Sequence, residues 1–181
     1  MDKMILRRSF RGLETNEDSS IAVVRKLKRC KELIAADTLL LYYPLKDEID
    51  IKPLYSLDKR IFLPVIENNE MLFRRYDGDL KKGKFGIMEP TGEYYTIGSN
   101  DLMIVPAVAY DRDGYRLGRG KGFYDNYIKR NRERLFSIAL AFSPSFVEKI
   151  EIDEWDERMD VLIVNGEIEY PQGVSSSGDW I

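Results

Sequence analysis

The chain has 181 residues, 44% of them hydrophobic, and a formal net charge of −3. This length and apolar content are enough for the core of one ordinary domain. The acidic balance argues against a general nucleic-acid binder, which is expected to be basic. Histidine is absent, which excludes Ser-His-Asp catalysis, Cys-His catalysis and histidine-ligated zinc. Any catalysis must therefore rely on Lys, Asp, Glu or a bound cation.

Cysteine content and hydropathy indicate where the protein works. The single cysteine, Cys30, cannot form a disulfide within the chain, and we expect it to be a small hydrophobic residue of the core. The sequence contains neither an apolar segment typical of a secretion signal nor an apolar run of about 18 residues. These features predict a cytoplasmic protein without a membrane partner.

The first third of the chain predicts helices followed by strands that are buried on both faces. Ser19 or Ser20 is placed to cap the second helix, whose apolar positions reach Leu33. Continuous apolar runs are typical of strands inside a sheet that is covered on both sides. The predicted elements are helices at 2–13, from 19 or 20 to about 33, and at 51–57, and strands at 38–43 and 61–66.

The rest of the chain predicts further buried strands around one long excursion. Residues 77–100 are polar and contain glycines, so we expect a long loop with little core. Asn165-Gly166 suits a two-residue type I′ turn and indicates a hairpin near the end. The other predicted elements are a peripheral strand at 71–76, strands at 102–106, 108–110, 136–141, 161–164 and 167–170, and a helix at 123–130.

Alternation of buried strands with helices predicts an α/β fold, a three-layer Rossmann-like architecture with a mainly parallel central sheet and an antiparallel edge hairpin. Residues 1–170 are expected to form this single domain, and residues 171–181, rich in serine and glycine, a loose tail. In such sheets, ligands bind beyond the carboxyl ends of the strands. We therefore expect the functional site at that edge.

The most informative segment is 114–125, Gly-Tyr-Arg-Leu-Gly-Arg-Gly-Lys-Gly-Phe-Tyr-Asp. Alternating glycines allow main-chain N–H groups to approach an anion closely, and the intervening cations add charge-assisted hydrogen bonds. A helix that begins just beyond them adds its partial positive charge. A solvated surface turn is the simpler interpretation, but the position between a buried strand and a helix favours phosphate binding.

This segment matches neither well-known phosphate loop. A Walker loop requires Ser or Thr after its Gly-Lys pair, whereas Lys121 is followed by Gly122. The dinucleotide-binding pattern requires a third glycine where this chain has Phe123. A different geometry of nucleotide site is required.

Two carboxylates are candidate ligands for a divalent cation. Asp125 lies one turn into the predicted helix, close to the expected phosphates, and Asp160 follows a run of acidic residues just before a strand. Magnesium usually takes one or two protein carboxylates together with substrate phosphates. Each also has a structural explanation, since Asp125 complements the helix dipole and Asp160 can belong to a solvated acidic loop.

Residues elsewhere gain interest only if the fold brings them to this segment. Lys3, Arg7 and Arg11 share one face of the first helix, although such a stripe is usually solvated. Glu48 follows a buried strand and can accept hydrogen bonds from a ring NH or amino group. Phe123 and Tyr124 can stack on a planar heterocycle or pack against the sheet.

Taken together, these motifs resemble the 5-formyltetrahydrofolate cyclo-ligase family, also called 5,10-methenyltetrahydrofolate synthetases. The resemblance covers about residues 3 to 165 and depends chiefly on Asp101-Leu-Met-Ile-Val-Pro106, Tyr110-Asp, Gly114 and residues 116–125. Asp47-Glu-Ile49 and Gly86-Ile-Met-Glu-Pro90 add supporting matches.

The resemblance implies ATP- and Mg²⁺-dependent cyclisation of 5-formyltetrahydrofolate to 5,10-methenyltetrahydrofolate, with release of ADP and phosphate. It implies catalytic roles for Arg119 and Lys121. ATP contacts are implied for Lys3, Arg7, Arg116, Leu117, Gly118, Arg119, Gly120, Lys121, Gly122, Phe123 and Tyr124. Folate contacts are implied for Tyr43, Glu48, Phe123 and Tyr124, and magnesium ligation for Asp125 and Asp160.

The chain departs from the family pattern at two positions. Family members often carry His-Asp where this chain has Trp155-Asp156, and Tyr where it has Phe123. Neither change removes a residue implied to bind phosphate or metal, so we expect activity. We also expect a monomer that binds neither nucleic acid nor membrane. Two alternatives stay open: an ATP-dependent kinase or ligase acting on another small acceptor, and a module that binds single-stranded RNA.

Overall fold

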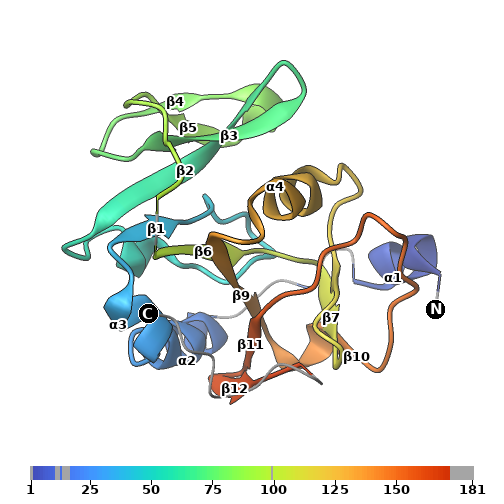
Figure 1. Ribbon diagram of the computed structural model, residues 1–181. Helices are drawn as coiled ribbons and strands as arrows, with labels where there is room; N and C mark the ends of the chain where they lie inside the picture. Colours follow the sequence, from blue (N-terminus) through green and yellow to red (C-terminus); the bar gives the residue numbers. More distant parts are fainter. Residues whose placement is uncertain (1, 11–12, 14–16, 99, 172–181) are drawn as a thin grey trace.

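A seven-stranded sheet forms the centre of the computed structural model, which describes residues 2–10, 13, 17–98 and 100–171 (Figure 1). The strand order is β12-β11-β9-β6-β1-β2-β3. Neighbouring pairs are parallel from β11 to β2, whereas β12 and β3 run antiparallel at the two edges. The strands are β1 (Thr38–Leu40), β2 (Arg60–Glu67), β3 (Glu70–Arg75), β6 (Asp101–Val105), β9 (Leu135–Ala141), β11 (Val161–Val164) and β12 (Glu167–Glu169). This arrangement confirms the predicted fold class.

Alternation along the buried strands creates two hydrophobic layers. Leu39 and Leu41 pack with α2 (Glu17–Leu27) and α3 (Lys31–Ala35) on one face, whereas Leu40 packs with α4 (Phe123–Asn131) on the other. Figure 1 shows these helices on opposite sides of the sheet. Because successive strand side chains point to opposite faces, a strand covered on both sides must be apolar throughout. That requirement explains the continuous apolar runs.

The helices before the sheet differ from the sequence expectation. Asp2 caps α1, which spans Lys3–Ser9 rather than 2–13, since the Asp2 Oδ1 accepts from the Met4 N–H at 2.6 Å. Ser20 lies inside α2 and is not a cap; its Oγ accepts instead from the Asp50 N–H at 3.1 Å. The helix continues only to Leu27, and α3 starts separately after Cys30.

Cys30 is 2% exposed and packs among the core residues beneath the sheet. Burial raises the pKa of its thiol to about 11. A thiol with so high a pKa is protonated at neutral pH, and the thiolate is the reactive form. Cys30 is therefore a core residue, as the sequence indicated.

An arm made of β2, β3 and a second hairpin projects above α4 (Figure 1). The sequence predicted a loop over 77–100, but this segment contains β4 (Leu80–Lys82) and β5 (Met88–Pro90), which pair antiparallel around η2 (Lys84–Gly86). The buried carboxylate of Glu89 accepts from the Ile66 N–H at 3.3 Å and joins this hairpin to β2. The expectation of a loop was therefore wrong, whereas the expectation of little core agrees with the burial, since Glu89 and Pro90 are the buried residues among those described in this segment.

A three-stranded sheet, separate from the central one, presents the glycine-cation segment. It consists of β10 (Phe146–Val147), β7 (Ala109–Asp111) and β8 (Arg116–Leu117). Asp111 is 1% exposed and holds the turn after β7, because its Oδ1 accepts from the N–H groups of Asp113 and Tyr115. Its Oδ2 accepts from the Ile150 N–H at 3.0 Å. These bonds explain why an aspartate follows Tyr110.

The predicted turn between β11 and β12 is confirmed, since Asn165 and Gly166 have φ values of 50° and 85°. Of the tail predicted at 171–181, residues 172–181 lie outside the described residues, as does Arg11 of the first helix's basic stripe. Within the described part of the chain, no helix combines the length and apolarity needed to cross a membrane.

Gly166→Ala is expected to destabilise the protein by about 2 kcal/mol or more, because a Cβ there adds a close contact to the strain of a positive φ. That Cβ would lie 3.1 Å from the Ala22 carbonyl oxygen. Gly78→Ala is a matched control, since Gly78 also has a positive φ but a Cβ there meets nothing within 4 Å. Urea unfolding measures both; equal losses of stability would contradict the packing argument.

Candidate active site

A cavity of about 620 Å³ lies where the carboxyl ends of the parallel strands meet the glycine-cation segment. All ten residues from Arg116 to Asp125 line it. Gly120 has a φ of 92°, and Gly122, at 66°, is the left-handed residue that starts α4. Side chains are strained in this conformation, so glycines allow the chain to turn from β8 directly into the helix. The N-terminus of α4 thereby faces the cavity.

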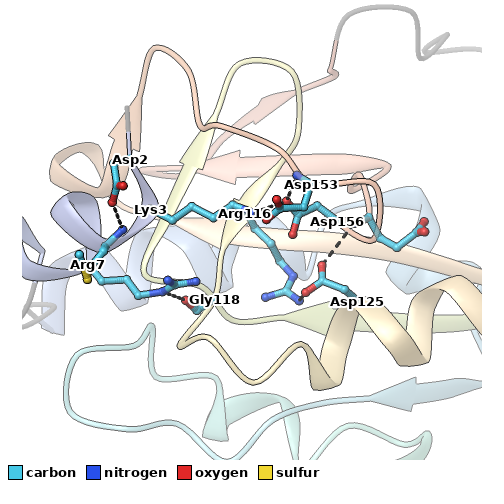
Figure 2. Close-up of polar contacts among 10 residues, drawn as sticks. Asp2, Lys3, Arg7, Arg116, Gly118, Asp125, Asp153 and Asp156 are labelled. Carbon is cyan, nitrogen blue, oxygen red and sulfur yellow. Dashed lines mark hydrogen bonds and ion pairs between the residues drawn. The ribbon is translucent and has the colours of Figure 1, made fainter.

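The first helix docks beside this segment, as the functional interpretation of its basic stripe required. Arg7 Nε donates to the Gly118 carbonyl oxygen at 2.9 Å. Lys3 Nζ forms ion pairs with Asp153, at 2.6 Å, and with Asp156. Figure 2 shows both cations reaching from α1 toward the segment. Lys3 and Arg7 both line the cavity, so their stripe is not merely solvated.

Arg116 and Asp125 form a buried ion pair across the base of the glycine turn (Figure 2). Arg116 Nη2 donates to Asp125 Oδ2 at 2.7 Å, and the two side chains are only 3% and 12% exposed. The other oxygen of Asp125 accepts from the Glu157 N–H at 3.3 Å. Arg116 Nε is buried without a hydrogen-bond partner. Asp125 thus lies in the cavity wall with both oxygens already in use.

The opposite wall contains the residues expected to contact folate. Tyr43 and Glu48 follow β1 and line the cavity. Glu48 Oε2 accepts from the Leu45 N–H at 2.9 Å. Burial raises the pKa of the Glu48 carboxyl, and hydrogen bonding to Leu45 N–H and the charge of Arg119 oppose that rise. Glu48 can accept hydrogen bonds from a ligand ring whenever it is ionised.

The arm supplies an apolar wall that the sequence did not assign to a site. Phe85 has a φ of 63°, is 57% exposed, and its ring lies 6.4 Å from that of Phe123. A large exposed aromatic ring at a cavity suits a planar ligand. The sequence signal that could have indicated this role is the position of Phe85, an aromatic residue, within a predicted loop. The cavity residues from the arm are Pro64, Ile66, Met71, Lys84, Phe85, Ile87 and Glu89.

Three further residues were also missed. Asp153, Trp155 and Asp156 line the cavity from the segment before β11. The sequence has a cluster of acidic residues in this segment, and we selected only Asp160 of that cluster as a metal ligand. Which carboxylates of the cluster face the cavity depends on contacts with Lys3, which is about 150 residues away in sequence.

Asp160 lies away from the cavity and is engaged elsewhere. Its carboxylate accepts from Arg132 Nη2 at 2.7 Å and from the Ser137 N–H and hydroxyl at 2.7 Å each. Asp160 precedes β11 and therefore lies at the amino ends of the parallel strands. Arg132 ends α4, so it is about 10 Å along the helix axis from Asp125. The structure does not bring Asp160 and Asp125 together.

Electrostatics divide the cavity into two ends. Five cationic side chains line the cavity from the glycine turn, β8 and α1, and we call this part its cationic end. Aromatic and apolar side chains of the arm and of the loop after β1 line it together with Lys84 of the arm, and we call that part its aromatic end. Such a cavity suits a ligand with one anionic and one heterocyclic part. The cationic set consists of Lys3, Arg7, Arg116, Arg119 and Lys121.

Comparisons with known proteins agree with this geometry. The 5-formyltetrahydrofolate cyclo-ligase of Haemophilus influenzae is 32% identical over 142 residues, which cover 71% of this chain and 76% of that protein. The mouse enzyme of the same name is 27% identical over 180 residues, 87% of this chain and 89% of that protein. The NMR structure of Aquifex aeolicus 5,10-methenyltetrahydrofolate synthetase is 33% identical, with a TM-score of 0.81 over 97% of this chain and 96% of that one.

The family model also matches the fold's extent. It covers residues 3–165, from the first residue of α1 to the turn after β11, and so includes every element that lines the cavity. The chain therefore belongs to the 5-formyltetrahydrofolate cyclo-ligase family.

Proposed function

We propose that the protein cyclises 5-formyltetrahydrofolate to 5,10-methenyltetrahydrofolate, consuming ATP with Mg²⁺ and releasing ADP and phosphate. The observation that carries the proposal is that one cavity is lined both by cationic side chains of the glycine turn and α1 and by aromatic and apolar side chains of the arm. Family membership supports the folate substrate. The cavity volume of about 620 Å³ is in the usual range for small-molecule sites.

The reaction needs a better leaving group than the formyl oxygen. Transfer of the terminal phosphoryl group of ATP to that oxygen makes it part of a phosphate. N10 then forms a bond to the formyl carbon, the carbon–oxygen bond breaks, phosphate leaves with the bonding electrons, and the N10 proton is lost. Charge neutralisation and alignment are the main requirements, so a chain without histidine can meet them.

The residues at the cationic end bind and neutralise phosphate. Arg119 and Lys121 lie on the turn itself, where they can contact the transferred phosphoryl group, while Lys3 and Arg7 reach in from α1. The N–H groups of the turn and the N-terminus of α4 add donors that bind phosphate oxygens. The ATP-binding segment proposed from the sequence is 116–124.

The residues at the aromatic end bind and orient folate. Glu48 accepts hydrogen bonds from the pteridine ring, and Tyr43, Phe123 and Tyr124 surround it. Burial raises the pKa of the Tyr124 phenol, so its hydroxyl remains a hydrogen-bond donor at neutral pH. Holding the ring here places N10 and the formyl group toward the turn.

The donor set fits magnesium only in combination with phosphate. Among the described residues, no three His, Cys, Asp or Glu side chains are grouped as a metal site. Asp125 and Asp156 both line the cavity and would hold the ion together with phosphate oxygens, the mode that Mg²⁺ prefers. When bound, Mg²⁺ supplies neutralisation of phosphate charge. Asp160 does not line the cavity and is not included in this proposal.

The proposal predicts appearance of the near-ultraviolet absorbance of the methenyl product when the protein receives 5-formyltetrahydrofolate, ATP and Mg²⁺. Arg119→Ala and Lys121→Ala should each lower kcat by about 100-fold, because each removes a charge that stabilises the transferred phosphoryl group. Lys28→Ala is a matched control, since Lys28 is exposed and outside the cavity. Wild-type rates in both loop variants would refute their role, and no product from the wild-type protein would refute the function.

Removal of divalent cations with EDTA should abolish turnover, and added Mg²⁺ should restore it. Asp125→Asn and Asp156→Asn should weaken Mg²⁺-dependent binding of a non-hydrolysable ATP analogue by about tenfold each, since each removes a charged ligand. Calorimetry measures the binding, and circular dichroism checks the fold. Asp160→Asn should lower the free energy of unfolding by about 1–3 kcal/mol and leave analogue binding unchanged. Weaker binding in this variant alone would return Asp160 to the metal site.

The raised pKa of Glu48 predicts a specific pH dependence of folate binding. Its ordinary value is 4.5, and burial moves it upward. The ionised carboxylate accepts from the ring, so affinity should fall as pH decreases through a pKa above 4.5. Glu48→Gln should bind more weakly at neutral pH and lose this dependence. If the folate affinity of Glu48→Gln still fell at low pH as in the wild-type protein, the titrating group would be a residue other than Glu48.

A further inference from the structure

Arg119 is held by the loop on the other side of the cavity. Its Nη2 donates to Asp47 Oδ1 at 2.6 Å and to Glu48 Oε1 at 3.4 Å. Asp47 and Glu48 follow β1, whereas Arg119 precedes α4. The contact therefore joins two loops that are far apart in sequence. One is the loop proposed for folate and the other is the loop proposed for phosphate.

The two carboxylates that hold Arg119 differ in their surroundings. Glu48 is 10% exposed, lines the large cavity and already accepts from the Leu45 N–H. Asp47 is 30% exposed and lies outside the lining of that cavity. Its contact with Arg119 is also the shorter of the two. When folate occupies Glu48, Asp47 is therefore the carboxylate that remains available to Arg119.

The geometry leaves part of the guanidinium for a ligand. Within the described part of the chain, the hydrogen bonds recorded for Arg119 all leave from Nη2. The N–H groups of Nε and Nη1 take no part in these two bonds, and each can donate a charge-assisted hydrogen bond to a phosphate oxygen. The Arg119 side chain is 47% exposed, so without an anchor it would have wide rotamer freedom.

We propose that Asp47 is a positioning residue for the phosphoryl-transfer step. It anchors Arg119 through Nη2, so that the N–H groups of Nε and Nη1 are held ready for the transferred phosphoryl group. The inference rests on the proposed function. An anchored arginine loses less freedom when it engages the transition state, so Asp47 should affect kcat more than substrate binding.

The test compares Asp47→Ala and Asp47→Asn with the wild-type protein. Asp47→Ala should lower kcat about tenfold and change KM for folate less than twofold, because Glu48 remains in place. Asp47→Asn keeps an oxygen acceptor and should recover part of the loss. In an Arg119→Ala background, Asp47→Ala should have no further effect on kcat.

Asp50→Asn is the matched control, since it removes one negative charge from the same loop. Asp50 is exposed, and its carboxylate accepts from the Lys52 N–H at 3.0 Å, a bond that asparagine can keep. It should leave kcat unchanged. A similar loss in Asp50→Asn and Asp47→Asn would attribute the effect to loop charge and overturn the positioning role.

Two other kinetic outcomes would also overturn the proposal. One is a wild-type kcat in Asp47→Ala. The other is tighter binding of a non-hydrolysable ATP analogue without loss of kcat, which would make Asp47 a competitor for Arg119 rather than its anchor.

A readout independent of turnover separates this inference from the proposed function. NMR relaxation of the Arg119 Nε–H group should show greater motion in Asp47→Ala than in the wild-type protein. If the wild-type protein failed to cyclise folate, the proposed function would be refuted, but the relaxation measurement would still test whether Asp47 anchors Arg119. Unchanged motion would overturn the anchor whatever the activity.

Discussion

The buried ion pair between Arg116 and Asp125 is the interaction on which the site depends. It joins the last strand before the glycine turn to the first turn of α4, and so fixes both ends of the segment that lies between them. Removing one partner would leave the other charge buried and unpaired, a loss that typically costs about 3–5 kcal/mol. The glycines allow the backbone many conformations in this turn, and the ion pair restricts it to the one that joins β8 to α4.

The same pair constrains how the site meets phosphate. Asp125 has its oxygens on Arg116 and on the Glu157 N–H, whereas Arg116 Nε is buried without a partner. A buried unpaired donor is unfavourable unless a ligand or water satisfies it. Phosphate oxygens at the turn would offer an acceptor near this donor. In this pair the charges of Arg116 and Asp125 balance, but the Nε–H of Arg116 still lacks an acceptor.

Sequence patterns predicted the parts of the structure that depend on local chemistry. The buried strands and the Asn165-Gly166 turn follow from alternation and from backbone preference, and the glycine-cation segment is contiguous. The division of α2 from α3 and the hairpin within 77–100 were missed, because weak local signals there are decided by packing against distant residues.

The site residues follow the same division. Residues 116–125 were found because they are adjacent, and Lys3 and Arg7 because the family resemblance pointed to them. Asp47 and Asp156 were not selected, because their contacts with Arg119 and Lys3 join residues that are far apart in sequence. Asp160 was selected for its chemistry, but chemistry alone does not say at which end of a strand a side chain lies.

Three of the cationic side chains that line the cavity are paired with carboxylates. Lys3 pairs with two aspartates, Arg116 with Asp125, and Arg119 with Asp47 and Glu48. Paired cations lie in fixed positions and carry less desolvation penalty than isolated ones. Under the proposed function, a triphosphate would bind to an organised array of compensated charges, in which its own negative charge is in excess. That excess would give a divalent cation a place in the site, although no three His, Cys, Asp or Glu side chains among the described residues are grouped as a metal site.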